Sequence, residues 1–283
     1  MPSASAFRGP FSSGSVPAVS DEPRILKQLD DEGVLLVTLN RPRVKNAFDE
    51  AQWDALADTL NEAREDRAVA VVLLTGAGGN FSSGADLSNF TGGTRVPRKD
   101  GLASAFYAAV KAIFAFDKPL LAAVAGVAVG GGCTIAIASD VVYVGESVRM
   151  RLPFANLGLV PEIASSYTLQ SAIGRQRAAE LFFTAEWIDA ARAVEMGMAA
   201  RRFPDAELLG AALAKAREIA QWPVSALVGI KRTLQVANRA GIEAALAVEE
   251  EGMRALAGSP ENIEAVKAFL EKRKPDFRQF RRR

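Results

Sequence analysis

The stretch VAVGGGCTIAIASD (127–140) places three consecutive glycines between an apolar run and the start of a helical pattern. Glycine inside regular structure costs about 1 kcal/mol relative to alanine, so a run of three needs a physical reason. A tight turn at which a ligand must approach the backbone closely is such a reason. The stretch therefore predicts a strand, a glycine turn and a helix, in that order.

The same order of strand, turn and helix recurs on both sides of this stretch. Short apolar runs that end in glycine are typical of strands buried on both faces of a parallel sheet. They stand at AVAVVLLTGAG (68–78), PLLAAVAG (119–126) and DVVYVG (140–145). Alternating strands and helices predict an α/β fold with much parallel pairing through about residue 200.

Local signals place several helices and one hairpin. Two strands are joined at 31–33, and either Asp49 or Asn46 caps the next helix, whose apolar residues recur at helical spacing. A further helix is predicted over 103–116. Beyond residue 205 the pattern is helical only, and a last helix opens at Ser259, which is followed by proline.

These patterns divide the chain into three regions. Residues 1–22 are rich in Ser, Pro and Gly and are expected to form a disordered tail or a cloning remnant, with a transit peptide as the weaker alternative. Residues 23–204 are expected to form the α/β core, and 205–283 a helical C-terminal region. No run approaches 18 apolar residues, so no membrane span is expected and the cytoplasm is the default location.

The composition removes several classes of chemistry. The 283 residues include no histidine and one cysteine, Cys133, and the net charge is +1. Ser-His-Asp and Cys-His catalysis are thereby excluded, and acid–base work falls to Asp, Glu, Lys or Tyr. The near-neutral charge gives no sign of a nucleic-acid or membrane partner. No metal and no separate cofactor are expected.

A second glycine-marked turn, NFSSGADLSNF (80–90), also follows a predicted buried strand. Backbone N–H groups at such junctions lack helical partners and can point at a ligand. Two N–H groups facing one point would form an oxyanion hole, although spacing alone favours a pair of tight turns that pack helices onto strands. The glycine run is not G-x-G-x-x-G and no Walker lysine follows it, so a nucleotide-binding fold is disfavoured.

The chain resembles the crotonase superfamily, the enoyl-CoA hydratase/isomerase family, from about residue 25 to 277. The resemblance is carried by LNRPRVKNAF (39–48), FSSGADL (81–87), KPLLAAVAGVAVGGGC (118–133), SDVVYVGE (139–146), LPFANLGLVPE (152–162) and EAVKAFLEKRKPDF (264–277). It implies a crotonase-like α/β spiral of repeated ββα units with a helical C-terminal region that builds a homotrimer or a dimer of trimers. It also implies an acyl-CoA substrate, so coenzyme A would enter as part of the substrate.

The resemblance assigns roles to individual residues. The thioester oxygen would be held by the N–H groups of Ala85 and Gly131, which would stabilise the charge of an enolate. Further residues placed like family contacts to coenzyme A or the acyl group are Arg43, Ser83, Asp86, Leu87, Gly130, Thr134, Phe154, Lys272, Arg273, Lys274 and Phe277. Each basic residue among them is equally explained as a solvated surface charge.

The departure from the family pattern concerns the acid–base group. Hydratases resemble one another in two glutamates, whose positions here hold Thr134 and Phe154, so ordinary hydration is disfavoured. Glu162 resembles the single glutamate of the Δ3-Δ2 enoyl-CoA isomerase branch. An apolar wall, for which Phe154 is the candidate, would raise its pKa. The structural alternative is that Pro161 and Glu162 open a helix and serve its N-terminus.

Three functions follow from this reading. The leading one is an isomerase that shifts a double bond from the 3 to the 2 position of an acyl-CoA. The alternatives are a hydratase-like enzyme for an unusual acyl-CoA and a catalytically silent acyl-CoA-binding paralogue. Acyl chain length is not encoded in any motif, and it depends on the region around 91–116.

Overall fold

The computed structural model describes residues 22–86 and 104–281. Its main sheet has six strands in the order β1-β2-β3-β4-β6-β9. The strands are β1 (Ile25–Leu29), β2 (Val34–Leu39), β3 (Val71–Gly76), β4 (Leu120–Val124), β6 (Val141–Gly145) and β9 (Arg201–Phe203). β1 and β2 form the expected antiparallel hairpin, and all other neighbours in this sheet are parallel.

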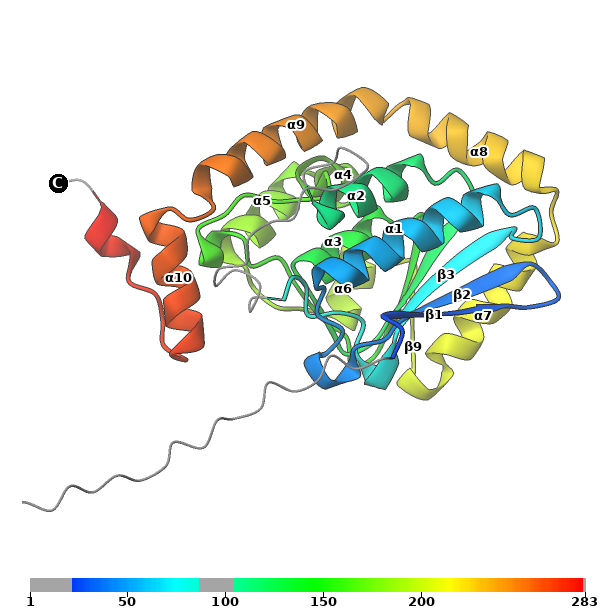
Figure 1. Cartoon of the computed structure of the whole chain (residues 1–283), viewed down its shortest axis with the longest axis horizontal. Coiled ribbons are helices and arrows are strands. Elements are labelled where there is room, and N and C mark those ends of the chain that lie inside the picture. Colours follow the sequence, from blue (N-terminus) through cyan, green and yellow to red (C-terminus); the bar gives the residue numbers. More distant parts are fainter. Residues whose placement is uncertain (1–21, 87–103, 282–283) are drawn as a thin grey trace, which may run out of the picture.

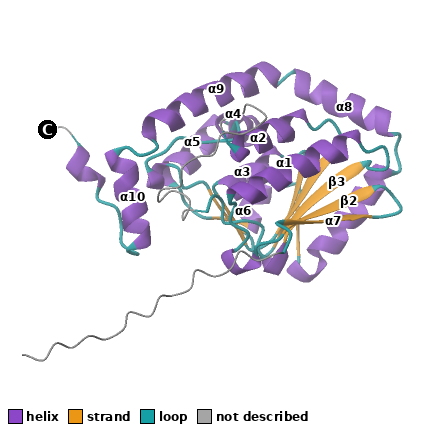
Figure 2. Cartoon of the chain, in the orientation of Figure 1, coloured by secondary structure: helices purple, strands orange, loops and turns teal. Residues whose placement is uncertain are grey.

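The main sheet is buried on both faces, as its continuous apolar runs predict. In β3, Val72 and Leu74 belong to one hydrophobic core while Val71 and Leu73 belong to another. Successive strand side chains point to opposite faces, so each core covers one side. Figure 2 shows the strands enclosed between helices.

Different helices cover the two faces of the sheet. α1 (Glu50–Glu65) packs against α2 (Ala105–Ala115) and contributes to the larger core. α7 (Asp205–Ala220) lies on the other face, where Leu208, Ala212 and Ala216 are buried. Asp49 caps α1 by accepting a hydrogen bond from Gln52 N at 2.8 Å, which resolves the choice between Asp49 and Asn46.

A smaller sheet supports the predicted glycine turn. It consists of β5 (Val127–Val129), β7 (Arg149–Arg151) and β8 (Ile188–Asp189) in that order. β5 leads directly into α3 (Gly131–Ala138), as the sequence predicts. The helices that follow are α4 (Ser165–Ile173), α5 (Arg175–Thr184) and α6 (Ala190–Met196).

Over its described residues, 205–281, the C-terminal region contains helical elements only, as expected. α8 (Val224–Val236) and α9 (Arg239–Leu256) run over the side of the molecule that carries α4, and α10 (Pro260–Leu270) lies at one end (Figure 1). Ser259 caps α10 by accepting from Asn262 N at 3.1 Å. Asp140 helps to dock α8, because its carboxylate lies 2.7 Å from Lys231 Nζ.

Some expectations change and others fall outside the described residues. The helix predicted over 103–116 begins at Ala105, and the apolar region predicted before the glycine turn is divided into β4 and β5. The short strands β7, β8 and β9 were not predicted. The expected tail and the segment 91–101 lie outside the described residues. None of the described helices has the length and apolarity needed to cross a bilayer.

Candidate active site

The predicted glycine-marked turns lie against each other. We call residues 82–86 the serine turn and residues 129–132 the glycine turn. Val129 N donates to Ser82 O at 2.9 Å, and Ser82 forms a parallel bridge with Ala128. A β-carbon on Gly84 would lie only 2.5 Å from Val129 O and 3.3 Å from Gly131 N. The two turns are therefore in direct contact at Gly131.

The hydrogen bonds between the serine turn and Phe48 do not involve the N–H group of Ala85. Phe48 N donates to Gly84 O at 2.8 Å, and Asp86 N donates to Phe48 O at 2.9 Å. Because successive N–H groups of an extended chain point to opposite sides, the N–H of Ala85 is directed away from Phe48. Among the described residues, no backbone acceptor for this N–H group is found.

The three glycines of the glycine turn meet different constraints. Gly130 has a φ of 51°, in the left-handed region that favours glycine. A β-carbon on Gly132 would lie 2.4 Å from Ser82 O, so this position brings the two turns together. Gly131 begins α3, and an N–H in the first turn of a helix has no intrahelical acceptor. The N–H of Gly131 is therefore also free of the helical ladder.

Glu162 lies beside Gly131. A β-carbon on Gly131 would lie 3.2 Å from Glu162 Oε1 and 3.3 Å from Trp53 Cη2. The carboxylate, the indole and the glycine backbone therefore converge on one point. Glu162 does not open a helix, because α4 begins only at Ser165. The structural alternative in which Pro161 and Glu162 serve a first helical turn is thus wrong.

The surroundings of Glu162 favour its protonated form. Burial and, to a smaller extent, the negative charge of Glu249 together raise the pKa of Glu162 to about 7. Trp53 supplies the neighbouring apolar surface and itself stacks on Phe48 with ring centroids 4.0 Å apart. A carboxyl group with a pKa near neutrality can both accept and return a proton at physiological pH.

Two residues at this site were not found by sequence reasoning. Trp53 is one of the apolar residues that recur at helical spacing in α1, and this periodicity does not reveal that its ring reaches Gly131. Glu249 lies on α9, and no local motif marks it. Both are brought to Glu162 by tertiary packing.

The hydratase-type positions hold side chains without acid–base capacity. Thr134 is fully buried, and its hydroxyl donates to the carbonyl oxygens of Gly130 and Gly131, at 3.3 and 3.2 Å. Phe154 is also buried, and its ring centroid lies 6.2 Å from that of Phe182. The aromatic ring that borders Gly131 together with Glu162 is that of Trp53.

Three other predicted contact residues, Arg43, Ser83 and Asp86, lie in or beside the serine turn. Arg43 is exposed on a short 3-10 turn, Pro42–Val44, and Ser83 Oγ donates to Val44 O of that turn at 3.1 Å. The carboxylate of Asp86 lies 3.0 Å from Arg41 Nη1 and forms an ion pair with it. Leu87 lies outside the described residues.

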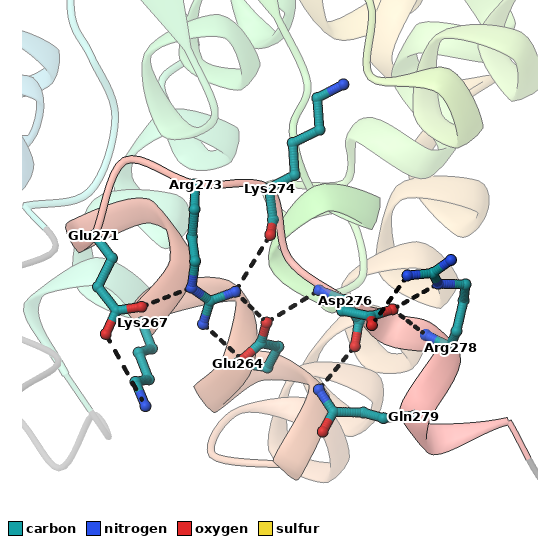
Figure 3. A network of polar contacts seen from close by, with 8 residues as sticks. All are labelled: Glu264, Lys267, Glu271, Arg273, Lys274, Asp276, Arg278 and Gln279. Atoms are coloured by element: carbon teal, nitrogen blue, oxygen red, sulfur yellow. Dashed lines mark hydrogen bonds and ion pairs between the residues drawn. The ribbon is translucent and has the colours of Figure 1, made fainter.

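The C-terminal candidates belong to a folded-back segment. Glu264 accepts hydrogen bonds from Arg273 Nη2 at 2.9 Å and from Asp276 N at 3.0 Å (Figure 3). These bonds tie residues 271–276 to α10. The side chain of Lys274 points away from this network in Figure 3, while Lys272 takes a positive φ of 54° and Phe277 begins the last 3-10 turn.

The site has no arrangement suited to a resident metal. Across residues 22–86 and 104–281, no group of three or more Cys, Asp or Glu side chains could hold a metal ion. Cys133 is fully buried, and burial raises the pKa of its thiol to about 12, so it is not a reactive nucleophile.

Comparison with known proteins gives consistent likenesses over nearly the whole chain. The sequence profile described as enoyl-CoA hydratase/isomerase matches residues 30–281. A 2,3-dehydroadipyl-CoA hydratase from Escherichia coli (strain K12) is 34% identical over 245 residues, covering 87% of this chain and 95% of the relative. A 1,2-epoxyphenylacetyl-CoA isomerase from the same organism is 33% identical over 250 residues, with the same coverage.

Solved structures agree with these sequence likenesses. An enoyl-CoA hydratase/isomerase from Pseudoalteromonas atlantica T6c matches with a TM-score of 0.83 and 33% identity, covering 90% of this chain and 99% of the other. A monofunctional enoyl CoA isomerase from M. smegmatis matches with a TM-score of 0.66 and 31% identity, covering 78% and 99%. Relatives named as hydratases and as isomerases thus share this architecture.

Proposed function

Because the chain belongs to the enoyl-CoA hydratase/isomerase family, we propose that it is an enoyl-CoA isomerase that moves a double bond of an acyl-CoA from the 3 to the 2 position. The observation that supports this proposal is the position of the Glu162 carboxylate against Gly131, while Thr134 and Phe154 occupy the positions where a hydratase carries glutamates. One acid–base group is enough for an isomerisation, whereas hydration divides its work between two.

The proposed reaction uses one carboxylate and two N–H groups. Glu162 removes a proton from C2 of the 3-enoyl thioester, and the electron pair of the broken C–H bond moves into a dienolate. The N–H groups of Ala85 and Gly131 stabilise the negative oxygen, each contributing roughly 3 kcal/mol to lowering the barrier. The protonated Glu162 then returns the proton to C4, which leaves the double bond between C2 and C3.

A direct assay tests the proposal. The purified protein should convert a 3-enoyl-CoA into the conjugated 2-enoyl thioester, whose formation is followed by ultraviolet absorbance. Glu162→Gln should lower kcat by about 10²- to 10⁴-fold, the range expected for loss of a general acid–base group. Full activity of that variant, or no conversion by the wild type, would falsify the assignment.

The pH dependence tests the same group. The base must be ionised to remove the proton, and the pKa of Glu162 is raised to about 7. The value of kcat/KM should therefore rise as the pH increases through about 7 and level off above it. A profile without a step between pH 6 and 8 would contradict the proposed base.

A second candidate function is favoured by one relative. The 34% identical relative is named a 2,3-dehydroadipyl-CoA hydratase, so hydration of an unusual acyl-CoA is the alternative. Loss of the 2-enoyl absorbance on a panel of acyl-CoA substrates would reveal it. Tight binding of acyl-CoA in calorimetry without turnover would instead indicate a catalytically silent paralogue.

We also propose contacts to coenzyme A and a homotrimer or a dimer of trimers. Arg43 lies on the turn that is hydrogen-bonded to Ser83, and Lys272, Lys274 and Phe277 follow α10, so each is a candidate contact to the nucleotide end of coenzyme A.

The C-terminal helices and the segment that links α7 to α8 expose large apolar side chains, as expected of a subunit interface. These are Trp222, Ile230, Leu234, Val236, Val248, Ile263, Phe269 and Leu270. Light scattering after size exclusion would give the subunit number.

A further inference from the structure

A second buried glutamate holds the segment that carries Glu162. Glu249, on α9, is only 6% exposed. Its Oε2 accepts a hydrogen bond from Ala164 N at 2.7 Å, and its Oε1 accepts one from Ser166 N at 2.9 Å. Both carboxylate oxygens are thus used on backbone N–H groups at the start of α4, immediately after Glu162.

The segment between Glu162 and α4 needs such support. We call residues 160–164 the glutamate turn. Ile163 and Ala164 have φ values of 56° and 51°, in the left-handed region that residues with a side chain rarely adopt. Isoleucine is β-branched, which makes this conformation still less favourable. The alanine that precedes α4 has no side-chain acceptor for the first N–H groups of the helix, so the acceptor comes from α9.

α9 contacts the glutamate turn and the start of α4 at two further points. A β-carbon on Gly252 would lie 2.9 Å from Val160 Cγ2, and one on Gly241 would lie 2.2 Å from the ring of Tyr167. Tyr167 also donates its hydroxyl to Asn238 Oδ1 at 3.0 Å. The helix therefore packs closely on both sides of the two Glu249 hydrogen bonds.

We propose that Glu249 is a positioning residue for Glu162: by accepting the N–H groups of Ala164 and Ser166, it holds the glutamate turn in the left-handed conformation that aims the Glu162 carboxylate at Gly131. The proposal rests on the proposed function, in which Glu162 moves the proton. It assigns to the C-terminal region a direct part in the geometry of the site.

The same carboxylate acts on Glu162 through its charge. The residues that face Glu162 are Trp53 from α1, Gly131 from α3 and Glu249 from α9. In the described part of the chain, Glu249 is the charged group whose electrostatic field acts on Glu162. The groups that act on Glu249 are the carboxyl of Glu162, through its charge, and the neutral groups of Ala164 and Ser166, through hydrogen bonds. Removing the charge of Glu249 should therefore ease ionisation of Glu162.

Two substitutions separate position from charge. Glu249→Gln keeps the length of the side chain but removes the charge and turns one acceptor into a donor. Glu249→Asp keeps the charge but is too short to reach both N–H groups. Glu251→Gln is the matched control, because it removes an exposed charge from the same helix.

The experiment measures the titration of Glu162 and the kinetics in the full chain. Carboxyl-labelled glutamate allows the Glu162 signal to be followed by ¹³C NMR, with its assignment from its loss in Glu162→Gln. In Glu249→Gln, we expect the midpoint to fall below about 7 but to stay above the ordinary value of 4.5, because burial, the larger cause of the raised pKa, remains. We expect kcat on a 3-enoyl-CoA to fall by about 10- to 100-fold with KM nearly unchanged, since small misplacement of a catalytic group has effects of this size.

The remaining variants complete the test. Glu249→Asp should lower kcat while the Glu162 midpoint stays near that of the wild type, and Glu251→Gln should change neither. Wild-type kcat and midpoint in both Glu249 variants would overturn the proposal, as would a loss of thermal stability with no change in either quantity. If the wild type turns over no 3-enoyl-CoA, the proposed function fails. The titration then decides the Glu249 proposal by itself, and an unchanged midpoint in Glu249→Gln overturns it.

Discussion

In the glycine turn the left-handed position is filled by Gly130, whereas in the glutamate turn the left-handed positions are filled by Ile163 and Ala164. The glycine turn is held by backbone contacts to the serine turn, through the hydrogen bond from Val129 N to Ser82 O and the close approach of Gly132 to Ser82. The glutamate turn depends on an acceptor that lies 85 residues away, on α9. The N–H groups of the site are thus fixed by contacts between two backbone turns, while the segment that carries its carboxylate is held by a side chain of α9.

The largest loss in the free energy of unfolding is expected from a substitution that disrupts the glycine turn. Gly132→Ala places a β-carbon 2.4 Å from a backbone oxygen, Ser82 O, which cannot move without displacing the serine turn. We expect the free energy of unfolding to fall by about 3 kcal/mol or more, measured by urea denaturation. In Gly130→Ala the new β-carbon meets open space, so only the backbone conformation, with φ 51° and ψ −122°, opposes it, at about 1–3 kcal/mol. Equal losses in the two variants would contradict this account.

Replacing Glu162 is expected to raise the free energy of unfolding by a comparable amount. Its pKa lies at about 7 in the folded chain against an ordinary 4.5, so between these values the folded state binds more protons than the unfolded state. Stability contributed by the protonated carboxyl is present below pH 4.5 and is lost as the pH rises through 7. At about 1.36 kcal/mol per pKa unit, ionisation costs roughly 3 kcal/mol above pH 7.

Glu162→Gln should therefore be more stable than the wild type by up to about 3 kcal/mol at pH 8, and nearly equal to it at pH 4. Denaturation at the two pH values checks this. Glu264→Gln is the control with the opposite trend. Arg273 lowers the pKa of Glu264 to about 2, so its contribution is present above pH 4.5 and is lost as the pH falls. A pH-independent gain in Glu162→Gln would show that the carboxyl is not destabilised by burial.

The difference between the two turns also explains what the sequence could predict. The caps Asp49 and Ser259 and the glycine turn follow from signals within a few residues, and the structure confirms them. The α/β crotonase fold is confirmed by the parallel main sheet and by solved structures with TM-scores up to 0.83 among those compared. Strands of two or three residues such as β8 carry too few side chains for a periodic signal.

The candidate site was predictable only in part, for the same reason. Gly131 and Ala85 lie in turns whose composition marks them, and Glu162 was identified by the resemblance. The neighbours that set the properties of Glu162 were not predictable, because Trp53 has the same spacing as ordinary core residues and Glu249 is one of several glutamates on α9. Only the folded chain shows which of these glutamates is buried.

The smallest predicted change in the free energy of unfolding comes from placing a glycine in the glutamate turn, at a position with a left-handed φ. Ala164→Gly removes a left-handed penalty of about 1–2 kcal/mol but adds about 0.4–1 kcal/mol of conformational entropy to the unfolded chain. We expect a net gain in stability of about 0.5 kcal/mol. The sharper measurement is the double variant with Glu249→Gln: a turn that no longer needs to be held should lose less stability when the acceptor is removed. Stability losses from Glu249→Gln that are equal in the two backgrounds would mean that the hydrogen bond to Ala164 N does not serve to hold the left-handed turn.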